Sequence, residues 1–213
     1  MRKLVIFGAG GFGQEAIWVA ESMNEELPEP LRWEVLGYLD DDSTKVGQRF
    51  YGHPVLAAPP DDRDLWFHCA LGSNTAREAV ASRLEARGWR PAALIHPSVV
   101  QAKFVEVGEG TYVGAGSILS PNARVGRHVI VNQRVSVGHD SLMEDFSQAC
   151  PGSQINGFCQ VLRGALIGSG ASIRQGRSVG PRAVVGANSL AVMDVEPGTT
   201  VLGVPARLLS RAE

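Results

Sequence analysis

The chain has 213 residues, of which 44% are apolar and 20% charged, and its formal net charge is −2. This is enough apolar sequence for one or two domains that need no disulfide staples. The near-neutral charge supplies no field for holding a nucleic-acid backbone, and no run of 18 apolar residues predicts a membrane span. Because no cleavable leader is recognisable either, we expect a cytoplasmic protein with neither nucleic acid nor membrane as a partner.

The cysteines and histidines lack the spacing of metal ligands. Cys69, Cys150 and Cys159 are odd in number and contain no CxxC pair, so we interpret them as small buried hydrophobic residues. No HxxxH or HExxH pattern links the five histidines, which are His53, His68, His96, His128 and His139. We therefore expect no metal site.

The helical signals of the chain lie before residue 95. The chain begins with an apolar strand at 4–7 that enters a glycine turn, followed by a helix at 13–25 and an alternating strand at 32–42 that ends in acids. A buried strand at 65–73 and an amphipathic helix that starts at 75 and stops at Gly88 come next. This order predicts a small α/β domain with a parallel sheet.

A six-residue repeat begins at residue 95. Of the seventeen residues at every sixth position from Ile95 to Ala191, sixteen are apolar, and only Gln101 breaks the series. Glycine often follows the apolar residue, which we interpret as a sharp backbone turn in each repeat. The pattern predicts a β-solenoid of short strands, in which three hexads make one coil and residues 18 apart stack.

The repeat continues from 95 to 191 without an insertion. An active site on the solenoid therefore has to use coil residues and neighbouring surfaces. His139 follows Gly138 at a turn, two residues past the inward Val137, so its side chain is predicted to point outward. From the residue alone, a histidine that merely faces solvent is an equally good interpretation.

Several motifs together resemble the hexapeptide-repeat acyltransferases. In chain order they are GAGGFG at 8–13, GYLDDD at 37–42, ALGSN at 70–74, LIHPS at 94–98, VGHD at 137–140 and GVPAR at 203–207. Over the whole chain they are similar to the sialic-acid O-acetyltransferases and the sugar-nucleotide N-acetyltransferases, which include enzymes of the bacillosamine pathway and of perosamine type. The resemblance implies a left-handed β-helix, a homotrimer with active sites between subunits, and acetyl-CoA bound in a groove.

The resemblance also implies how the chain is divided. We expect a Rossmann-like nucleotide-sugar-binding half domain at 1–95, an all-β left-handed parallel β-helix acetyltransferase domain at 96–194, and a C-terminal tail at 195–213. A complete dinucleotide fold needs a second βαβ half, for which about ninety residues leave no room, so one nucleotide sugar is favoured over NAD.

Acetyl transfer from a thioester needs a base, and histidine titrates in the right range. By resemblance, His139 is this base and Asp140 is the acidic neighbour that raises its basicity. Gly157 lies one coil further on, where a backbone N–H would meet the thioester oxygen, although a simple turn glycine is the alternative. The resemblance implies that acetyl-CoA is bound at Gln148, Gly157, Ser169 and Ala187. Many relatives have a second histidine at the position of Gln148. Glutamine can form hydrogen bonds there but cannot act as a base.

A second group of residues suits a nucleotide-linked sugar. The glycine loop after the first strand fits GxGxxG, a pattern that cradles phosphate at a helix N-terminus, and acids after the second strand suit a ribose or a base edge. By resemblance, the sugar nucleotide is bound by Gly10, Gly11, Phe12, Asp40, Asp41, Gly72 and Ser73. Phe12 stands where the family has histidine, which removes a possible phosphate donor. An ordinary tight turn with solvated acids is the alternative.

The later repeats and the residues after them are rich in arginine. These residues are Arg163, Arg174, Arg177, Arg182, Arg207 and Arg211. Guanidinium groups bind phosphates well, so this excess of positive charge suits coenzyme A. A solvated charged surface is an equally good interpretation.

The leading hypothesis is transfer of acetyl from acetyl-CoA to the amino group of a nucleotide-linked amino-deoxysugar. O-acetylation of sialic acid or a related hydroxyl would use the same base and remains open. A non-catalytic sugar-binding scaffold is the alternative of another class, and the His139–Asp140 pair argues against it. The sequence names neither the sugar, nor the nucleotide base, nor the acetylated position.

Overall fold

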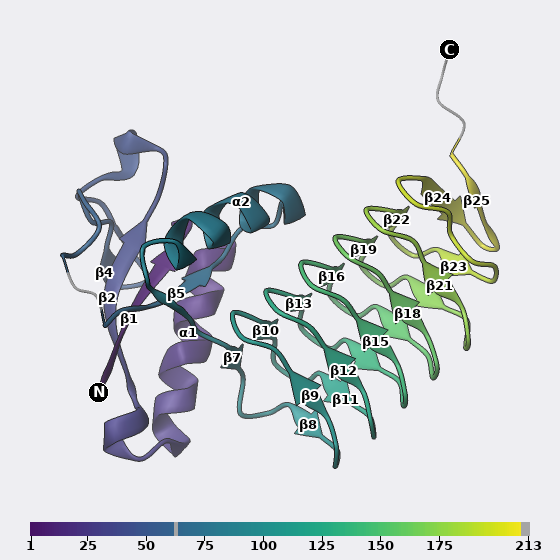
Figure 1. Ribbon diagram of the computed structural model, residues 1–213, viewed down its shortest axis with the longest axis horizontal. Helices are drawn as coiled ribbons and strands as arrows, with labels where there is room; N and C mark the ends of the chain where they lie inside the picture. Colours follow the sequence, from purple (N-terminus) through teal and green to yellow (C-terminus); the bar gives the residue numbers. More distant parts are fainter. Residues whose placement is uncertain (62–63, 210–213) are drawn as a thin grey trace. The chain divides into compact units, whose positions relative to one another are not determined.

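A computed structural model describes residues 1–61 and 64–209 of the chain. Arg211 therefore lies outside the described residues. The chain divides into two compact units, Met1–Pro97 and Ser98–Glu213, which Figure 1 colours from purple to teal and from teal to yellow. None of the helices in the described part is long and apolar enough to cross a membrane.

The first unit is built on a parallel sheet with the strand order β2-β1-β5-β6. Its strands are β1 (Arg2–Phe7), β2 (Trp33–Leu39), β5 (Trp66–Cys69) and β6 (Arg90–Pro91). The remaining elements are the helices α1 (Gly11–Glu26) and α2 (Asn74–Glu85), the 3-10 turns η1 (Glu29–Leu31) and η2 (Ser43–Lys45), the hairpin strands β3 (Arg49–Phe50) and β4 (His53–Pro54), and β7 (Leu94–Ile95). The β3–β4 hairpin is an addition that the sequence pattern did not indicate.

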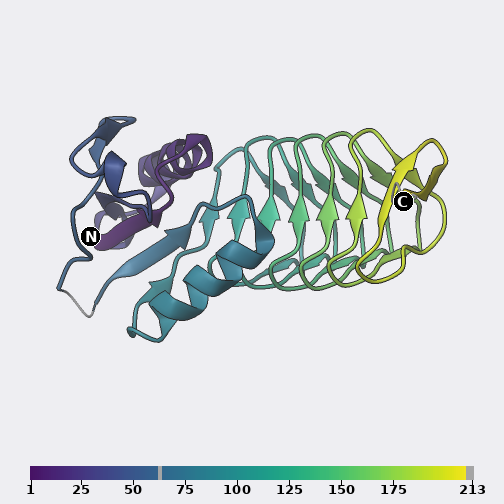
Figure 2. The ribbon, with the colours of Figure 1, turned by 90° about the horizontal axis from the view of Figure 1, so that it is seen from above.

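Apolar side chains bind both helices to this sheet. Leu4 and Ile6 of β1 are completely buried, as is Ile17 of α1, and Leu84 of α2 is 3% exposed. Figure 2 shows α1 in purple and α2 in teal on opposite sides of the sheet. The chain thus moves outward from β1 to β2 and, in the other direction, from β5 to β6. The crevice beyond the carboxyl ends of β1 and β5 is a topological switch point, where open α/β sheets bind ligands.

The second unit is a β-solenoid of three parallel sheets. One sheet contains β10 (Tyr112–Val113), β13 (Ile130–Val131), β16 (Gln148–Ala149), β19 (Leu166–Ile167), β22 (Val184–Val185), β24 (Thr200–Gly203) and β25 (Ala206–Leu208). A second contains β8 (Val100–Gln101), β11 (Ile118–Leu119), β14 (Ser136–Val137), β17 (Gln154–Ile155), β20 (Ser172–Ile173) and β23 (Leu190–Ala191). The third contains β9 (Glu106–Val107), β12 (Arg124–Val125), β15 (Leu142–Met143), β18 (Gln160–Val161) and β21 (Ser178–Val179).

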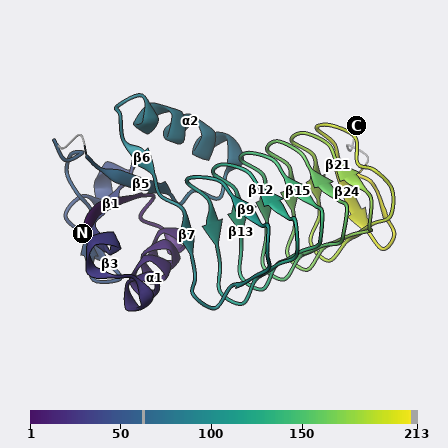
Figure 3. The ribbon, with the colours of Figure 1, turned by 60° about the horizontal axis from the view of Figure 1, so that its bottom comes forward.

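The six-residue repeat correctly predicts the inward positions of these coils. Val113, Leu119 and Val137, each at a predicted inward position, are completely buried. Gln101, the exception in the series, lies in the first coil and is exposed. Strands pair in parallel with the strand 18 residues on, as Leu119 does with Val137. Stacked apolar side chains therefore fill the solenoid, and Figure 3 shows its three-sided coils.

The turns of the solenoid come from a different residue than the sequence analysis expected. A left-handed conformation with positive φ occurs three residues after the inward residue, as at Asp140 (φ 58°) and Gly152 (φ 69°). Glycines directly after the inward residue have another reason. A Cβ on Gly138 would lie 2.5 Å from the backbone of Asn156 in the next coil. The interpretation of these glycines as turn residues was wrong, because close approach of adjacent coils is what requires them.

The last coil is shortened. Val201 of β24 pairs with Val185, only 16 residues earlier, and an isolated bridge joins Val195 to Val179 across the same spacing. β25 then pairs antiparallel with β24. Residues 200–208, which the sequence analysis assigned to a tail, thus extend one of the solenoid sheets.

Candidate active site

His139 and Asp140 form a hydrogen-bonded pair at one corner of the solenoid, between β14 and β15. The Nδ1 atom of His139 lies 2.8 Å from Oδ2 of Asp140, and their side chains are 49% and 37% exposed. The second carboxylate oxygen of Asp140 accepts a hydrogen bond of 2.8 Å from Nδ2 of Asn122, one coil earlier. The bonds from His139 and then Asn122 lower the pKa of Asp140, which keeps this carboxylate ionised.

The imidazole of His139 lies against the backbone of Gly157. A Cβ on Gly157 would be only 2.5 Å from Nε2 of His139, so only glycine leaves room for the ring. The Phe158 ring meets the imidazole edge to face, with centroids 4.9 Å apart. The structure therefore brings three predicted site residues together, His139, Asp140 and Gly157, and adds Asn122 and Phe158 to them.

A buried hydroxyl joins the coil of His139 to the coil of Gly157. The Oγ atom of Ser141 donates to the carbonyl of Asn156 at 2.8 Å and accepts from the N–H of Cys159 at 3.0 Å. Ser141 is 1% exposed, so these bonds are shielded from water. They fix the spacing between the backbone that follows His139 and the backbone around Gly157 in the next coil.

Gln148 lies elsewhere on the solenoid. It stands on β16, opposite in phase to the inward Ala149, and is in register with Ile130 and Leu166 on the adjacent strands. The residue is only 8% exposed, and its Oε1 atom is buried without a hydrogen-bond partner in the described structure. Its Nε2 atom lies 3.6 Å from Sγ of Cys150. A buried amide oxygen without a donor is costly, and it has capacity for a hydrogen bond from a ligand.

Ser169 and Ala187 stack on one another at a third place, the corner between β19 and β20 and its equivalent one coil on. A Cβ on Gly168 would lie 2.5 Å from the N atom of Ala187, and the carbonyl of Ser169 accepts from the N–H of Asn188. In a three-sided coil, the corner of His139 is opposite the sheet that contains Gln148. Within one solenoid, the predicted catalytic and acetyl-CoA residues therefore lie at two corners and on one face, and not in a single cluster.

Two of the predicted arginines line one cavity of the solenoid. Arg163 and Arg182 lie there with Pro181 and Pro197, around a volume of about 480 Å³. Arg163 is also 3.4 Å from a carboxylate oxygen of Asp145. Part of the predicted positive surface is thus already neutralised by an acid.

The glycine loop of the first unit has clear structural reasons for its glycines. Gly8 has φ 107°, and a Cβ there would lie 2.7 Å from the carbonyl oxygen of Ala70, which follows β5. A Cβ on Gly13 would collide with the carbonyl oxygen of Gly8. Gly10 is the N-cap of α1 and offers no capping side chain. Backbone N–H groups at this helix start are therefore available to an anion.

The other predicted residues of this group are Phe12, within the loop, and Gly72 and Ser73, which follow β5. Phe12 meets His68 edge to face, with ring centroids 6.4 Å apart. The Oγ atom of Ser73 caps α2 by accepting from the N–H of Ala76 at 3.3 Å, so Ser73 has a structural role of its own. Gly72 has open space around it, because a Cβ there would meet nothing within 4 Å.

The two predicted acids have different environments. The carboxylate of Asp40 accepts from the N–H of Ala9 at 2.8 Å and from Nζ of Lys45 at 2.9 Å, and it thereby ties the glycine loop to β2. Burial alone would raise the pKa of Asp40, but the bonds from Ala9 and Lys45 outweigh burial and lower it. Asp41 is 71% exposed and forms an ion pair of 3.3 Å with Arg83 of α2.

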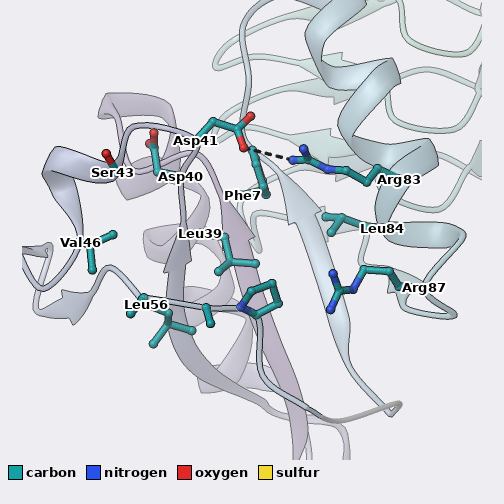
Figure 4. Close-up of a pocket in the computed structure, with 13 residues that line it drawn as sticks. Phe7, Leu39, Asp40, Asp41, Ser43, Val46, Leu56, Arg83, Leu84 and Arg87 are labelled. Atoms are coloured by element: carbon teal, nitrogen blue, oxygen red, sulfur yellow. Dashed lines mark hydrogen bonds and ion pairs between the residues drawn. The ribbon is translucent and has the colours of Figure 1, made fainter.

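The Asp41–Arg83 ion pair borders a cavity of about 340 Å³ (Figure 4). It lies at the carboxyl ends of β1 and β2, and its lining residues are Phe7, Leu39, Asp40, Asp41, Ser43, Val46, Leu56, Ala57, Ala58, Pro59, Arg83, Leu84 and Arg87. The sequence analysis missed Arg83 and Arg87. Their i, i+4 spacing on a predicted helix was the available signal, since it places both on one face.

The three cysteines have the buried character expected of them. Cys69 and Cys159 are buried, and Cys150 is partly buried. Burial raises the pKa of Cys69 to about 12 and also raises the pKa of the other two thiols. Among residues 1–61 and 64–209, no three His, Cys, Asp or Glu side chains gather as metal ligands would.

Known proteins match this chain along nearly its whole length. Residues 3–84 match the PglD N-terminal domain family. GDP-perosamine N-acetyltransferase of Escherichia coli O157:H7 is 29% identical over 220 residues, which cover 97% of this chain and 96% of that protein. The serine acetyltransferase of Escherichia coli K12 is 28% identical over 105 residues, or 45% of this chain and 38% of that enzyme.

Solved structures agree with these matches. The acetyltransferase domain of PglB from Neisseria gonorrhoeae FA1090 superposes with a TM-score of 0.87 at 29% identity, covering 98% of this chain and 100% of that one. A histidine-to-asparagine variant of perosamine N-acetyltransferase from Caulobacter crescentus, in complex with CoA and GDP-perosamine, gives 0.89 at 26% identity, covering 99% and 98%. Along nearly its whole length, the chain is therefore similar to sugar N-acetyltransferases and acetyltransferase domains with this fold.

The predicted resemblance to the sialic-acid O-acetyltransferase and sugar-nucleotide N-acetyltransferase group is confirmed, and so is the predicted fold class of an α/β half domain followed by a left-handed β-helix. The prediction of an acyltransferase is likewise confirmed. The roles of individual side chains in this chain remain predictions.

Proposed function

We propose that this chain transfers acetyl from acetyl-CoA to the amino group of a nucleotide-linked amino-deoxysugar, with His139 as general base. The observation that supports this most is the His139–Asp140 pair, whose imidazole lies over Gly157 on a solenoid without insertions. The relatives that match from end to end include a GDP-perosamine N-acetyltransferase and a structure with bound acetyl-CoA.

The carboxylate of Asp140 determines how His139 would act. Ionised Asp140 accepts a hydrogen bond from the Nδ1–H group, so the neutral ring carries its lone pair on Nε2. Nε2 takes a proton from the amine as nitrogen attacks the thioester carbonyl and the new C–N bond forms. The tetrahedral intermediate then expels the thiolate by breaking the C–S bond, and the imidazolium returns the proton to sulfur.

The first unit supplies the acceptor site in this proposal. The start of α1, with Gly10, Gly11 and Phe12, offers backbone N–H groups to the diphosphate, and Gly72 and Ser73 after β5 complete the predicted set. The cavity beside the Asp41–Arg83 ion pair receives the nucleoside, because its walls combine apolar side chains with both charges. Asp40 has a different part, since its oxygens already hold Ala9 and Lys45 in place.

We further propose that the enzyme is a homotrimer whose sites lie between subunits. The acetyl-CoA residues Gln148, Ser169 and Ala187 are not at the corner of His139 in one solenoid. A second copy whose β16 sheet faces that corner would bring the two groups to one ligand. The unused acceptor Oε1 of Gln148 agrees with this arrangement, because it would then meet a donor.

Release of free thiol from acetyl-CoA tests the proposed function. The purified enzyme is mixed with acetyl-CoA and a panel of amino and hydroxy sugar nucleotides linked to guanine, uracil or thymine. We expect turnover with an amino sugar and none with its hydroxyl counterpart. Turnover only with hydroxy sugars would transfer the assignment to O-acetylation, and a protein that neither binds acetyl-CoA nor releases thiol would be a scaffold.

A further inference from the structure

The residue 18 positions before Asp140 completes a chain of side chains that leads to the proposed base. Asn122 donates from Nδ2 to Oδ1 of Asp140 at 2.8 Å, and Oδ2 of the same carboxylate lies 2.8 Å from Nδ1 of His139. Each carboxylate oxygen thus has a donor of its own. A carboxylate held only by the imidazole can rotate about its Cβ–Cγ bond, whereas a second donor on the other oxygen fixes its plane.

The local backbone does not by itself require asparagine at this position. Asn122 has φ 62°, a left-handed conformation that Asn adopts more readily than most residues. However, Phe104 and Phe158 occupy the same corner one coil before and one coil after the Asn122–Asp140 pair, with φ of 63° and 58°. Since phenylalanine occupies this conformation at the same corner twice, the side-chain contact with Asp140 is the better explanation of Asn122.

Stability also gives little reason for the contact. Both Asn122 and Asp140 are exposed, and a hydrogen bond that competes with water contributes little to folding. The contact does favour ionised Asp140, because hydrogen bonds from His139 and from Asn122 both lower the pKa of that carboxyl. An ionised carboxylate in a fixed plane is what a base needs in order to keep its proton on Nδ1.

We propose that Asn122 is a positioning residue, which orients Asp140 so that His139 keeps its proton on Nδ1 and presents Nε2 to the acceptor. This inference rests on the proposed function for its kinetic consequences, but the orientation of the imidazole can be measured without turnover. Asn122 acts only through Asp140, so it should affect the chemical step and not the binding of acetyl-CoA.

The decisive variant is Asn122→Asp. It retains the size of the side chain and its tolerance of positive φ, but replaces the N–H donor by an oxygen that repels Asp140. We expect kcat to fall about tenfold or more, with KM for acetyl-CoA within twofold of the wild-type value. In an Asp140→Ala background the same change should alter kcat by less than twofold, because the residue through which it acts is gone.

A control variant separates a loss of stability from a loss of positioning. Asn188→Asp changes an asparagine with φ 53° at another corner, so its melting temperature reports the cost of the substitution in this conformation. Asn122→Asp and Asn188→Asp should melt within a few degrees of one another. A normal kcat in folded Asn122→Asp, or an equal loss of kcat with and without Asp140, would overturn the proposal.

Nitrogen NMR of histidine-labelled protein provides the readout that is independent of activity. We expect the His139 signal, assigned by its loss in His139→Ala, to report the Nδ1–H tautomer in the wild type and a mixture in Asn122→Asp. An unchanged tautomer in the variant contradicts the positioning role. If the wild-type protein shows this tautomer but transfers no acetyl group, the proposed function fails while the positioning role stands.

Discussion

Two corners of the same solenoid carry a histidine, and only one of them resembles an active site. His128 lies three residues after the inward Val125, has φ 53°, and is 1% exposed. His139 lies two residues after the inward Val137 and is half exposed. The two imidazoles therefore differ both in their position in the hexad and in their exposure to a ligand.

The neighbours of the two rings differ accordingly. His128 stacks in parallel on Phe146, with centroids 5.1 Å apart, and the guanidinium of Arg163 lies 4.9 Å from the same Phe146 ring. Its imidazole fills the space over Gly110 in the preceding coil. His139 instead leans over Gly157 in the next coil and bonds to a carboxylate. The comparison indicates a packing histidine at one corner, while the other corner carries the histidine that we propose as the base.

Replacing His139 should have the largest effect on activity. We expect His139→Ala to lower turnover at least about a hundredfold, because a positioned base contributes roughly 10²–10⁴ in rate. The half-exposed side chain supports little packing, so the variant should fold and assemble as the wild type does. Thiol release and a melting curve check the two statements. Near-normal turnover in the folded variant would remove His139 from the mechanism.

Adding one methyl group beside the ring should have the next largest effect. The Cβ of Gly157→Ala would lie 2.5 Å from Nε2 of His139, and the imidazole has to move away. Displacing a catalytic group by about 1 Å costs on the order of a hundredfold, so we expect kcat to fall roughly ten- to hundredfold.

Gly152→Ala is the control for this change. A Cβ there meets nothing within 4 Å, although φ is 69°, so the variant loses stability through its backbone but keeps its kcat. If Gly157→Ala retains full turnover, or if Gly152→Ala loses as much, the contact between ring and glycine has no catalytic meaning.

The packing histidine should behave in the opposite way. His128→Ala removes a buried ring that is stacked on Phe146, and we expect it to lower the free energy of unfolding by roughly 2–4 kcal/mol. Its kcat, measured below the melting temperature, should equal that of the wild type. Urea unfolding at one fixed protein concentration measures the first value, since the proposed assembly would make stability depend on concentration. A loss of kcat without a loss of stability would contradict the assignment of the two corners.

The sequence predicts much of this contrast but not all of it. The hexad phase correctly identifies Val125 and Val137 as inward, and spacing by 18 correctly places Gly157 beside His139. The same spacing also leads from Asp140 to Asn122, a signal that was present and unused. Periodicity alone does not predict the contacts of a side chain that reaches another helix or strand. Asp40 and Asp41 differ in their environments because Lys45 pairs with the first and Arg83 with the second, and no periodicity specifies where these two cations point.

Gln148 offers the smallest effect, and it tests whether the β16 sheet belongs to the active site. Its Oε1 atom is buried without a donor, so Gln148→Met should raise the free energy of unfolding by about 1 kcal/mol, because an unsatisfied amide is replaced by an apolar chain of similar size. If this amide meets acetyl-CoA in a neighbouring subunit, KM for acetyl-CoA should rise severalfold in the same variant. Gln154→Met is the matched control, since Gln154 has the same strand phase but is exposed and should change neither value. A stabilised variant with an unchanged KM would show that the buried oxygen is a packing defect and not a binding group.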